Sequence, residues 1–150
     1  MRAKFIASSA CYLVKDDKIL FIKYSKKWNQ VYAPPGGKVE KSETPTECLI
    51  REFKEETNLD LINPKLKFIA SYQADEEGVI YFYVADDYKG ELANEHEEGS
   101  LSWVSIKDSF KLKQFPMNEI IFDYLFKEGL FEGKFIFKGS KIQTYAVKEI

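Results

Sequence analysis

Residues 37–59 read GKVEKSETPTECLIREFKEETNL, and this segment contains a clear signal for the start of a helix. Thr44 supplies an N-cap side chain, Pro45 fits the first helical position, and Glu47 stands three residues after the cap. Asn58 is one of the few non-glycine residues that tolerate the left-handed backbone conformation of a helix end. The pattern therefore predicts a helix between Thr44 and Asn58.

The expected helix carries three glutamates on one face. Side chains three and four positions apart share a helix face, which brings Glu52, Glu55 and Glu56 together. Leu49 and Phe53 form a separate apolar ridge toward the core. Crowded like charges repel, so such a helix exposes them to water or gains a compensating cation. Oxygen-only ligands suit hard ions such as Mg²⁺, with Mn²⁺ as a substitute, and the alternative is an ordinary solvated helix face.

The residues around the glutamates favour a ligand site over that alternative. Gly36 and Gly37 provide a flexible backbone whose amides and carbonyls can approach a phosphate or a metal closely. Lys38 adds a positive charge at the same place. Arg51 is expected to pair with Glu43 and to hold the loop against the helix, which would fix where the glutamates point. The alternative for Arg51 is a surface salt bridge that contributes little.

Alternating apolar residues and turn signals predict the remaining elements. The expected strands are residues 4–15, 18–24, 66–74, 79–85, 101–104, 134–137 and 143–147. A second amphipathic helix is expected from about Asn118 to Leu130, with an apolar stripe of Ile121, Phe122, Leu125 and Phe126. Strands and helices without repeats or linkers predict one core in an α+β or mixed α/β domain.

The composition is that of one folded domain. The chain has 150 residues, of which 45% are hydrophobic and 15% aromatic, far from the balance that keeps a chain disordered. A net charge of −2 provides no basic field for duplex nucleic acid. Cys11 and Cys48 lack metal-ligand spacing. No segment approaches the ~20 apolar residues of a membrane span, so we expect a soluble, cytoplasmic protein.

The glutamate segment resembles the Nudix box, G-x5-E-x7-R-E-U-x-E-E-x-G-U, in which U is a bulky apolar residue. The matching positions are Gly37, Glu43, Arg51-Glu52, Phe53, Glu55-Glu56 and Leu59. The one departure is Asn58, which stands in place of the second glycine and can adopt the same backbone turn. The chain is thus similar to the Nudix hydrolases, and in particular to the MutT-type members.

The resemblance implies the fold and the chemistry of that family. The fold would be a Nudix-type α/β/α sandwich with a mixed β-sheet, in a single domain over residues 1–150. Water activated by Mg²⁺ would attack a phosphorus of a nucleoside diphosphate linked to a further group. The implied metal ligands are a carbonyl of Gly36 or Gly37 and the side chains of Glu52, Glu55, Glu56 and Glu98. The implied catalytic residues are Glu52, Glu55, Arg51 and Lys38.

Glu98 is included because residues 98–104, Glu-Gly-x-Leu-x-Trp-Val, are similar to the MutT-type segment that supplies a metal-binding glutamate. A glutamate in this loop is also an alternative to the helix glutamates as the general base. His96 is expected to be a solvated loop residue, since an all-oxygen magnesium site does not need imidazole.

The resemblance to MutT-type 8-oxo-dGTP diphosphatases extends to the C-terminal part of the chain. It implies cleavage of a nucleoside triphosphate to the monophosphate and pyrophosphate, with an oxidised purine nucleotide such as 8-oxo-dGTP as substrate. Asn118 would contact the base, although the matching residue is usually acidic and the alternative role is a helix cap. Lys23 would meet the triphosphate and Ser8 the base. The aromatic candidates for stacking on a base, which are otherwise core residues, are Tyr32, Phe115 and Trp28.

Other readings stay open at the level of the sequence. Ala33-Pro34-Pro35 replaces a polar residue of the related enzymes, which favours a different base preference. A Nudix hydrolase for a nucleotide sugar, ADP-ribose, a dinucleoside polyphosphate or an RNA cap is the main alternative. A nucleotide sensor without catalysis is disfavoured because all box glutamates are present. The expected partner is a small-molecule nucleotide bound by a monomer or homodimer.

Overall fold

The computed structural model describes residues 4–25, 30–93, 95–96 and 99–150. Its longer strands are β1 (Phe5–Lys15), β2 (Lys18–Tyr24), β6 (Lys65–Gln73), β7 (Glu77–Ala85), β10 (Gly99–Ser105), β11 (Phe131–Lys138) and β12 (Lys141–Glu149). The short strands are β3 (Tyr32–Ala33), β4 (Gly36–Lys38), β5 (Asp60–Ile62), β8 (Asp87–Lys89) and β9 (Glu95–His96). The helices are α1 (Pro45–Thr57), α2 (Ile106–Ser109) and α3 (Pro116–Phe122).

A mixed sheet organises the described residues, with the strand order β12-β11-β6-β7-β1-β2-β10-β9. β1 runs parallel to β7 and β11 runs parallel to β6, while the other pairs are antiparallel. β4 pairs with β1, β3 pairs with β2, and β5 and β8 form a separate ribbon. The predicted strands are all present, so the predicted mixed α+β architecture is confirmed.

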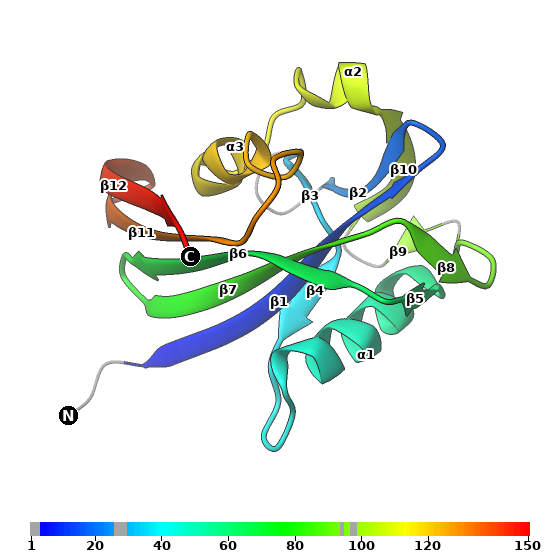
Figure 1. Ribbon diagram of the computed structural model, residues 1–150, viewed down its shortest axis with the longest axis horizontal. Coiled ribbons are helices and arrows are strands. Elements are labelled where there is room, and N and C mark those ends of the chain that lie inside the picture. The colour runs from blue at the N-terminus through cyan, green and yellow to red at the C-terminus, as the bar shows by residue number, and fades with distance from the viewer. Residues whose placement is uncertain (1–3, 26–29, 94, 97–98) are drawn as a thin grey trace.

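Helices α1 and α3 lie on opposite sides of the sheet (Figure 1). Each side has its own apolar cluster. Tyr12 and Phe21 belong to the cluster that includes Ile121 of α3, and Cys11 and Phe53 belong to the cluster under α1. This alternation follows from the strand period, since neighbouring residues of β1 point to opposite faces. Both cysteines are buried and free.

The predicted start and end of the first helix are confirmed. The Thr44 hydroxyl accepts a hydrogen bond from the Glu47 amide, and the Glu47 carboxylate accepts one from the Thr44 amide. This reciprocal capping satisfies two amides that the helix leaves without intrahelical partners. Asn58 ends the helix in the left-handed conformation with φ of 67°. The helix that carries the glutamates is therefore fixed at both ends by local chemistry.

The predicted bounds of the second amphipathic helix were wrong. Helix α3 begins at Pro116 and ends at Phe122, because Pro116 takes the first helical position. Beyond it the chain continues in tighter turns, in which the amides of Tyr124 and Leu125 bond to carbonyls three residues back. Most of the predicted apolar stripe is buried nevertheless, whereas Phe126 is 48% exposed.

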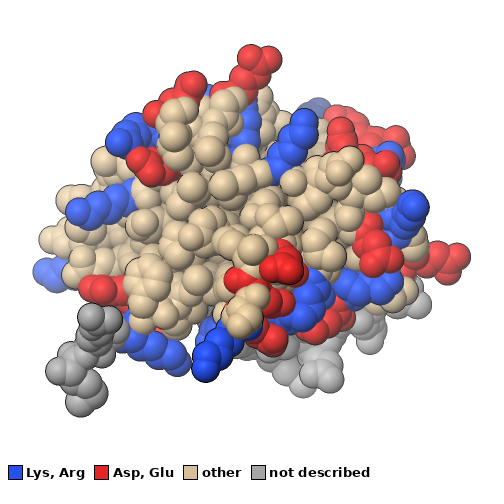
Figure 2. All heavy atoms as spheres, turned by 60° about the horizontal axis from the view of Figure 1, so that its bottom comes forward, with Lys and Arg blue, Asp and Glu red and all other residues tan. Residues whose placement is uncertain are grey.

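Charges are mixed on the surface. On the face shown in Figure 2, acidic and basic side chains are interspersed around a broad uncharged area. A long polyanion such as duplex nucleic acid would need a continuous basic surface, which this face does not offer. Among the helices of the described ranges, none has the length and apolar character needed to cross a membrane.

Candidate active site

Helix α1 presents an acidic face beside strand β4. Leu49 and Phe53 are fully buried on its core side, and this packing fixes the rotation of the helix. The side chains of Glu52 and Glu55 are 20% and 58% exposed, and Glu56 is buried at the edge of the core. The predicted separation of an apolar ridge from a face of carboxylates is confirmed.

Arg51 connects this face to the preceding loop. Its Nε and Nη2 atoms donate to the two carboxylate oxygens of Glu43 at 2.7 and 2.9 Å, a bidentate pair. Its Nη1 atom donates to Glu52 at 2.8 Å and lies 3.3 Å from Glu55, while Nη2 also reaches the carbonyl of Lys38. The expected pairing with Glu43 is confirmed. One guanidinium thus offsets the repulsion among carboxylates from the loop and the helix.

The Glu43 carboxylate is held strongly in its charged form. Hydrogen bonds from Arg51, together with one from the Glu40 amide, lower the pKa of Glu43 from 4.5 to about 2. Hydrogen bonds to Glu43 and Glu52 raise the pKa of the Arg51 guanidinium. The pair therefore stays ionised throughout the pH range in which enzymes work, and the position of the loop does not depend on pH in that range.

Glu43→Gln is expected to flatten the pH dependence of stability between about pH 4.5 and 2. Because the pKa of Glu43 is lower in the folded protein than in the unfolded chain, its ion pair contributes fully above that window. The contribution is lost as the pH falls through it. Denaturant unfolding of the wild type and the variant from pH 2 to 7 measures the difference. The exposed Glu40, 3.6 Å from Arg51, provides the control substitution Glu40→Gln. A difference between wild type and Glu43→Gln that is constant with pH would contradict this account.

The diglycine lets the carboxylates approach the backbone. The amide of Gly36 donates to Oε1 of Glu56 at 3.1 Å. A Cβ atom on Gly37 would lie 2.2 Å from the carboxylate carbon of Glu52, so the space of the missing side chain is filled by that carboxylate. Glycine at these two positions therefore places two of the three helix carboxylates against strand β4.

The donor set fits a hard divalent cation. The nearby groups are carboxylate oxygens and peptide carbonyls, which Mg²⁺ and Mn²⁺ prefer. The Gly37 carbonyl also lies 3.5 Å from the thiol of Cys48, which donates to it. In the part of the chain that the structure describes, no three acidic, His or Cys side chains form a ready-made cluster. The Arg51 guanidinium lies between Glu52 and Glu55. The predicted ligand Glu98 lies outside the described residues.

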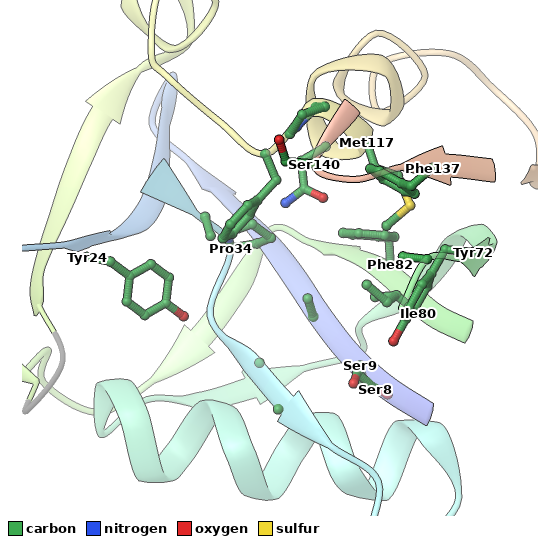
Figure 3. Close-up of a pocket in the computed structure, with 18 of the residues that line it drawn as sticks. Ser8, Ser9, Tyr24, Pro34, Tyr72, Ile80, Phe82, Met117, Phe137 and Ser140 are labelled. Atoms are coloured by element: carbon green, nitrogen blue, oxygen red, sulfur yellow. The ribbon is translucent and has the colours of Figure 1, made fainter. Parts of the chain in front are cut away.

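A cavity of about 490 Å³ opens beside the diglycine. Strands β1, β4, β6 and β7, the start of α3 and the turn after β11 form its walls (Figure 3). All of its lining residues are uncharged, and most are apolar: Ser8, Ser9, Ala10, Tyr24, Ala33, Pro34, Gly36, Gly37, Tyr72, Ala74, Ile80, Phe82, Phe115, Pro116, Met117, Asn118, Phe137, Gly139 and Ser140. A flat, neutral group suits such a cavity better than a phosphate does.

The structure brings some of the predicted binding residues to this cavity. Ser8 and Asn118 line it, as does Phe115. Asn118 is 6% exposed and contributes to the cavity lining. The alternative role of Asn118 as a helix cap is wrong, because the N-cap of α3 is Phe115. An amide side chain in the wall of a cavity can donate a hydrogen bond to a polar ligand and accept one from it.

Two predicted binding residues lie elsewhere. Tyr32 is not part of the cavity lining, and its ring packs edge-on against Phe21 in the core. Its expected contact with a base stays a prediction. The Nζ atom of Lys23 lies 5.5 Å from the centre of the Tyr32 ring, outside the cavity lining. Lys38 is exposed at the end of β4, and Trp28 lies outside the described residues.

Sequence reasoning missed most of the cavity walls. Tyr72, Phe82, Met117, Phe137 and Ser140 come from segments far apart in the chain, and none belongs to a motif. The signal available for them was a hydrophobic strand pattern, which is the same for a core residue and for a cavity wall.

The fold and the site define a domain of the NUDIX type. The NUDIX domain profile matches residues 4–125, which include the diglycine, α1 and α3. A relative with 34% identity is a Nudix hydrolase as well. The chain therefore belongs to the Nudix hydrolase family, which acts on pyrophosphate bonds.

Individual relatives agree with this assignment. The uncharacterized Nudix hydrolase YvcI of Bacillus subtilis (strain 168) is 34% identical over 135 residues, which cover 85% of this chain and 84% of that protein. The ADP-ribose pyrophosphatase of Methanocaldococcus jannaschii is 34% identical over 118 residues, which cover 74% of this chain and 68% of that protein. The crystal structure of the MutT protein from Bacillus halodurans has a TM-score of 0.88 at 25% identity, covering 95% of this chain and 97% of that chain.

Proposed function

We propose that this Nudix hydrolase cleaves a nucleoside triphosphate to the monophosphate and pyrophosphate, with an oxidised purine nucleotide such as 8-oxo-dGTP as substrate. The observation that carries the proposal is the neutral cavity beside the diglycine, with the amide side chain of the largely buried Asn118 in its wall. The similarity to the MutT protein structure supports a MutT-type enzyme. The base would occupy the cavity, and the phosphates would extend past Gly37 toward α1.

The acidic face of α1 would supply the catalytic groups. Glu52, Glu55 and Glu56 would hold Mg²⁺ together with a carbonyl of Gly36 or Gly37 and with Glu98. Bound Mg²⁺ would lower the pKa of the attacking water and neutralise charge on the leaving group.

The carboxylate of Glu52 or Glu55 would take the proton of the water as its oxygen bonds to phosphorus. The phosphoanhydride bond between the α- and β-phosphorus atoms then breaks, which gives the monophosphate and pyrophosphate. Arg51 would position these glutamates through the contacts described above. Lys38 and Lys23 would attract the phosphates.

Asn118 would select the base. Its amide can both donate to and accept from a purine edge, whereas a carboxylate only accepts. Asn118→Ala is therefore expected to lower kcat/KM for purine nucleotides by about 10- to 100-fold, because a base group bound there loses its partner. Steady-state hydrolysis of 8-oxo-dGTP, dGTP and dATP measures the effect.

Gln114→Ala is the matched control for Asn118→Ala. Gln114 is also a buried amide, but it accepts from the hydroxyl of Tyr12 and does not line the cavity. The Gln114→Ala variant should have lower stability, but the order of its kcat/KM values for the three nucleotides should not change. Equal losses of kcat/KM in both variants would mean that Asn118 has only a structural role.

A nucleoside diphosphate linked to a sugar is the second candidate substrate, because a relative with 34% identity is an ADP-ribose pyrophosphatase. The cavity would hold the base in that case too, so the two substrates differ at the leaving group. Comparing kcat/KM for 8-oxo-dGTP, dGTP, dATP, ADP-ribose and diadenosine polyphosphates separates the proposals. Preference for 8-oxo-dGTP supports the triphosphate assignment, and preference for ADP-ribose or a dinucleotide overturns it.

A further inference from the structure

The C-terminal hairpin forms one wall of the cavity, although it lies beyond residues 4–125, which match the NUDIX domain. Strands β11 and β12 are paired up to Lys138 and Lys141, so the turn consists of Gly139 and Ser140. Figure 3 shows Phe137, Met117 and Ser140 on the side of the cavity opposite Ser8 and Ser9. The hairpin tip is therefore part of the ligand site and not an appendage.

An irregularity in the hairpin occurs where it meets the cavity. Ile136 pairs with Thr144 but Phe137 pairs with Ile142, which leaves Gln143 as an extra residue in β12. A β-bulge of this kind bends the strand pair and redirects side chains, and bulges are frequent next to ligand sites. The bulge thus separates the regularly paired end of the hairpin, which joins the sheet, from a tip that faces the cavity.

The end of the hairpin that joins the sheet is well anchored. β11 pairs with β6 along most of its length. Phe135 is fully buried, and its ring stacks on that of Tyr145 with 5.8 Å between the ring centres. Because the sheet end of the hairpin is fixed in this way, the tip is a preformed wall of the cavity. A substitution at the tip changes the shape of the cavity without unfolding the sheet.

The tip separates neutral from charged side chains. Phe137 and Ser140 line the cavity, whereas Lys138 and Lys141 are exposed and do not contribute to the lining. Gly139 has a φ of 64°, which suits a two-residue hairpin turn, and a Cβ atom there would meet no atom within 4 Å. The hairpin tip thus contributes the ring of Phe137 and the hydroxyl of Ser140 to the cavity wall. The ammonium groups of the two lysines lie outside the cavity.

We propose that Phe137 and Ser140 are specificity-determining residues for the base. This inference rests on the proposed function, since it assigns the cavity to the base of a nucleotide. Phe137 provides apolar surface against which the base packs, and Ser140 provides a hydroxyl that donates to or accepts from a polar group on the base edge. The hairpin outside the matched region sets base preference, and α1 supplies the chemistry that all substrates share.

Nucleotide binding tests the proposal separately from hydrolysis. Calorimetry compares GMP with ribose 5-phosphate, which has the sugar and phosphate but no base. Phe137→Ala is expected to weaken GMP binding about tenfold and to leave ribose 5-phosphate binding unchanged, since base–aromatic contacts are of this size. Ser140→Ala is expected to change the ratio of 8-oxo-dGMP to dGMP affinity by about threefold or more, through one neutral hydrogen bond.

Ile142→Ala is the matched control for Phe137→Ala. Ile142 pairs with Phe137 across the hairpin and packs on the same core, but it does not line the cavity. It should lower the melting temperature without selective loss of GMP binding. Equal effects of the two variants on GMP, or no preference of the wild type for GMP over ribose 5-phosphate, would overturn the proposal. If the wild type binds GMP but releases pyrophosphate from no nucleotide, the proposed function fails, and the hairpin assignment is still decided by the binding data.

Discussion

Glu52→Gln and Glu55→Gln variants are expected to fold normally and to lose about 10³-fold in kcat. Glutamine keeps the size of the side chain but removes the negative charge that would hold a divalent cation or accept a proton. The fold should tolerate the change, because neither side chain is buried and each pairs with Arg51 near the surface. Loss of one charge also relieves repulsion among the helix carboxylates.

Glu47→Gln provides the matched control on the same helix. Glu47 is exposed and caps the first turn, and glutamine can make the same capping contact. Its kcat should stay within about twofold of the wild type, as for a substitution away from the chemistry. Melting temperatures and pyrophosphate release, measured on all three variants, check the prediction. Full activity in both Glu52→Gln and Glu55→Gln would contradict a metal site on α1.

Alanine at the two adjacent glycines is expected to have opposite effects. At Gly37 the new Cβ atom would meet the Glu52 carboxylate, whose flexible end can move away, so the fold survives. The carboxylate is then displaced from its place against β4, and kcat should fall about 100-fold, because small misplacements of catalytic groups have effects of this size. Stability should change little.

At Gly36 the new Cβ atom would lie 2.0 Å from the carbonyl oxygen of Ser9 and 2.6 Å from the Cα atom of Ala10. Both are backbone atoms of β1, which pairs with β4 at this point and cannot move freely. Overpacking of this kind lowers stability by about 1–3 kcal/mol or more. Denaturant unfolding and initial rates on both variants test the contrast. A stable and fully active Gly37→Ala variant would show that the position of Glu52 does not matter.

Local chemistry made part of the structure predictable. The capping box at Thr44 and Glu47 and the left-handed Asn58 define α1 within a few residues of sequence. The pairing of Arg51 with Glu43 was predictable from the same segment, because the two residues are only 8 positions apart in the sequence. Residues close in sequence carry enough information when the contact that fixes them is also local.

Long-range packing limited the remaining predictions. Tyr32 is a candidate for contact with a base, but its ring also packs edge-on against Phe21, and a sequence pattern does not distinguish these two environments. Asn118 was interpreted as a base contact or a helix cap, and the choice depended on whether the helix begins at Pro116. The hairpin wall at Phe137 was not predicted at all, because its place in the cavity follows from the pairing of β11 with β6.

The site therefore has two parts with different origins. The acidic face of α1 and Gly37 lie within the segment that resembles the Nudix box, and in our proposal they supply the shared chemistry. The cavity is assembled from β1, β6, β7, α3 and the C-terminal hairpin, and in our proposal it determines the choice of substrate. Variants of Glu52 and of Phe137 should accordingly separate turnover from base recognition.

The central claim is that pyrophosphate is released from a purine nucleoside triphosphate with a divalent cation held by α1. The most direct measurement is the identity of the products formed from 8-oxo-dGTP, with Mg²⁺ and with Mg²⁺ plus chelator. The account predicts 8-oxo-dGMP and pyrophosphate in equal amounts with Mg²⁺, and no products with chelator. Release of single phosphates, or turnover that does not change with chelator, would contradict it.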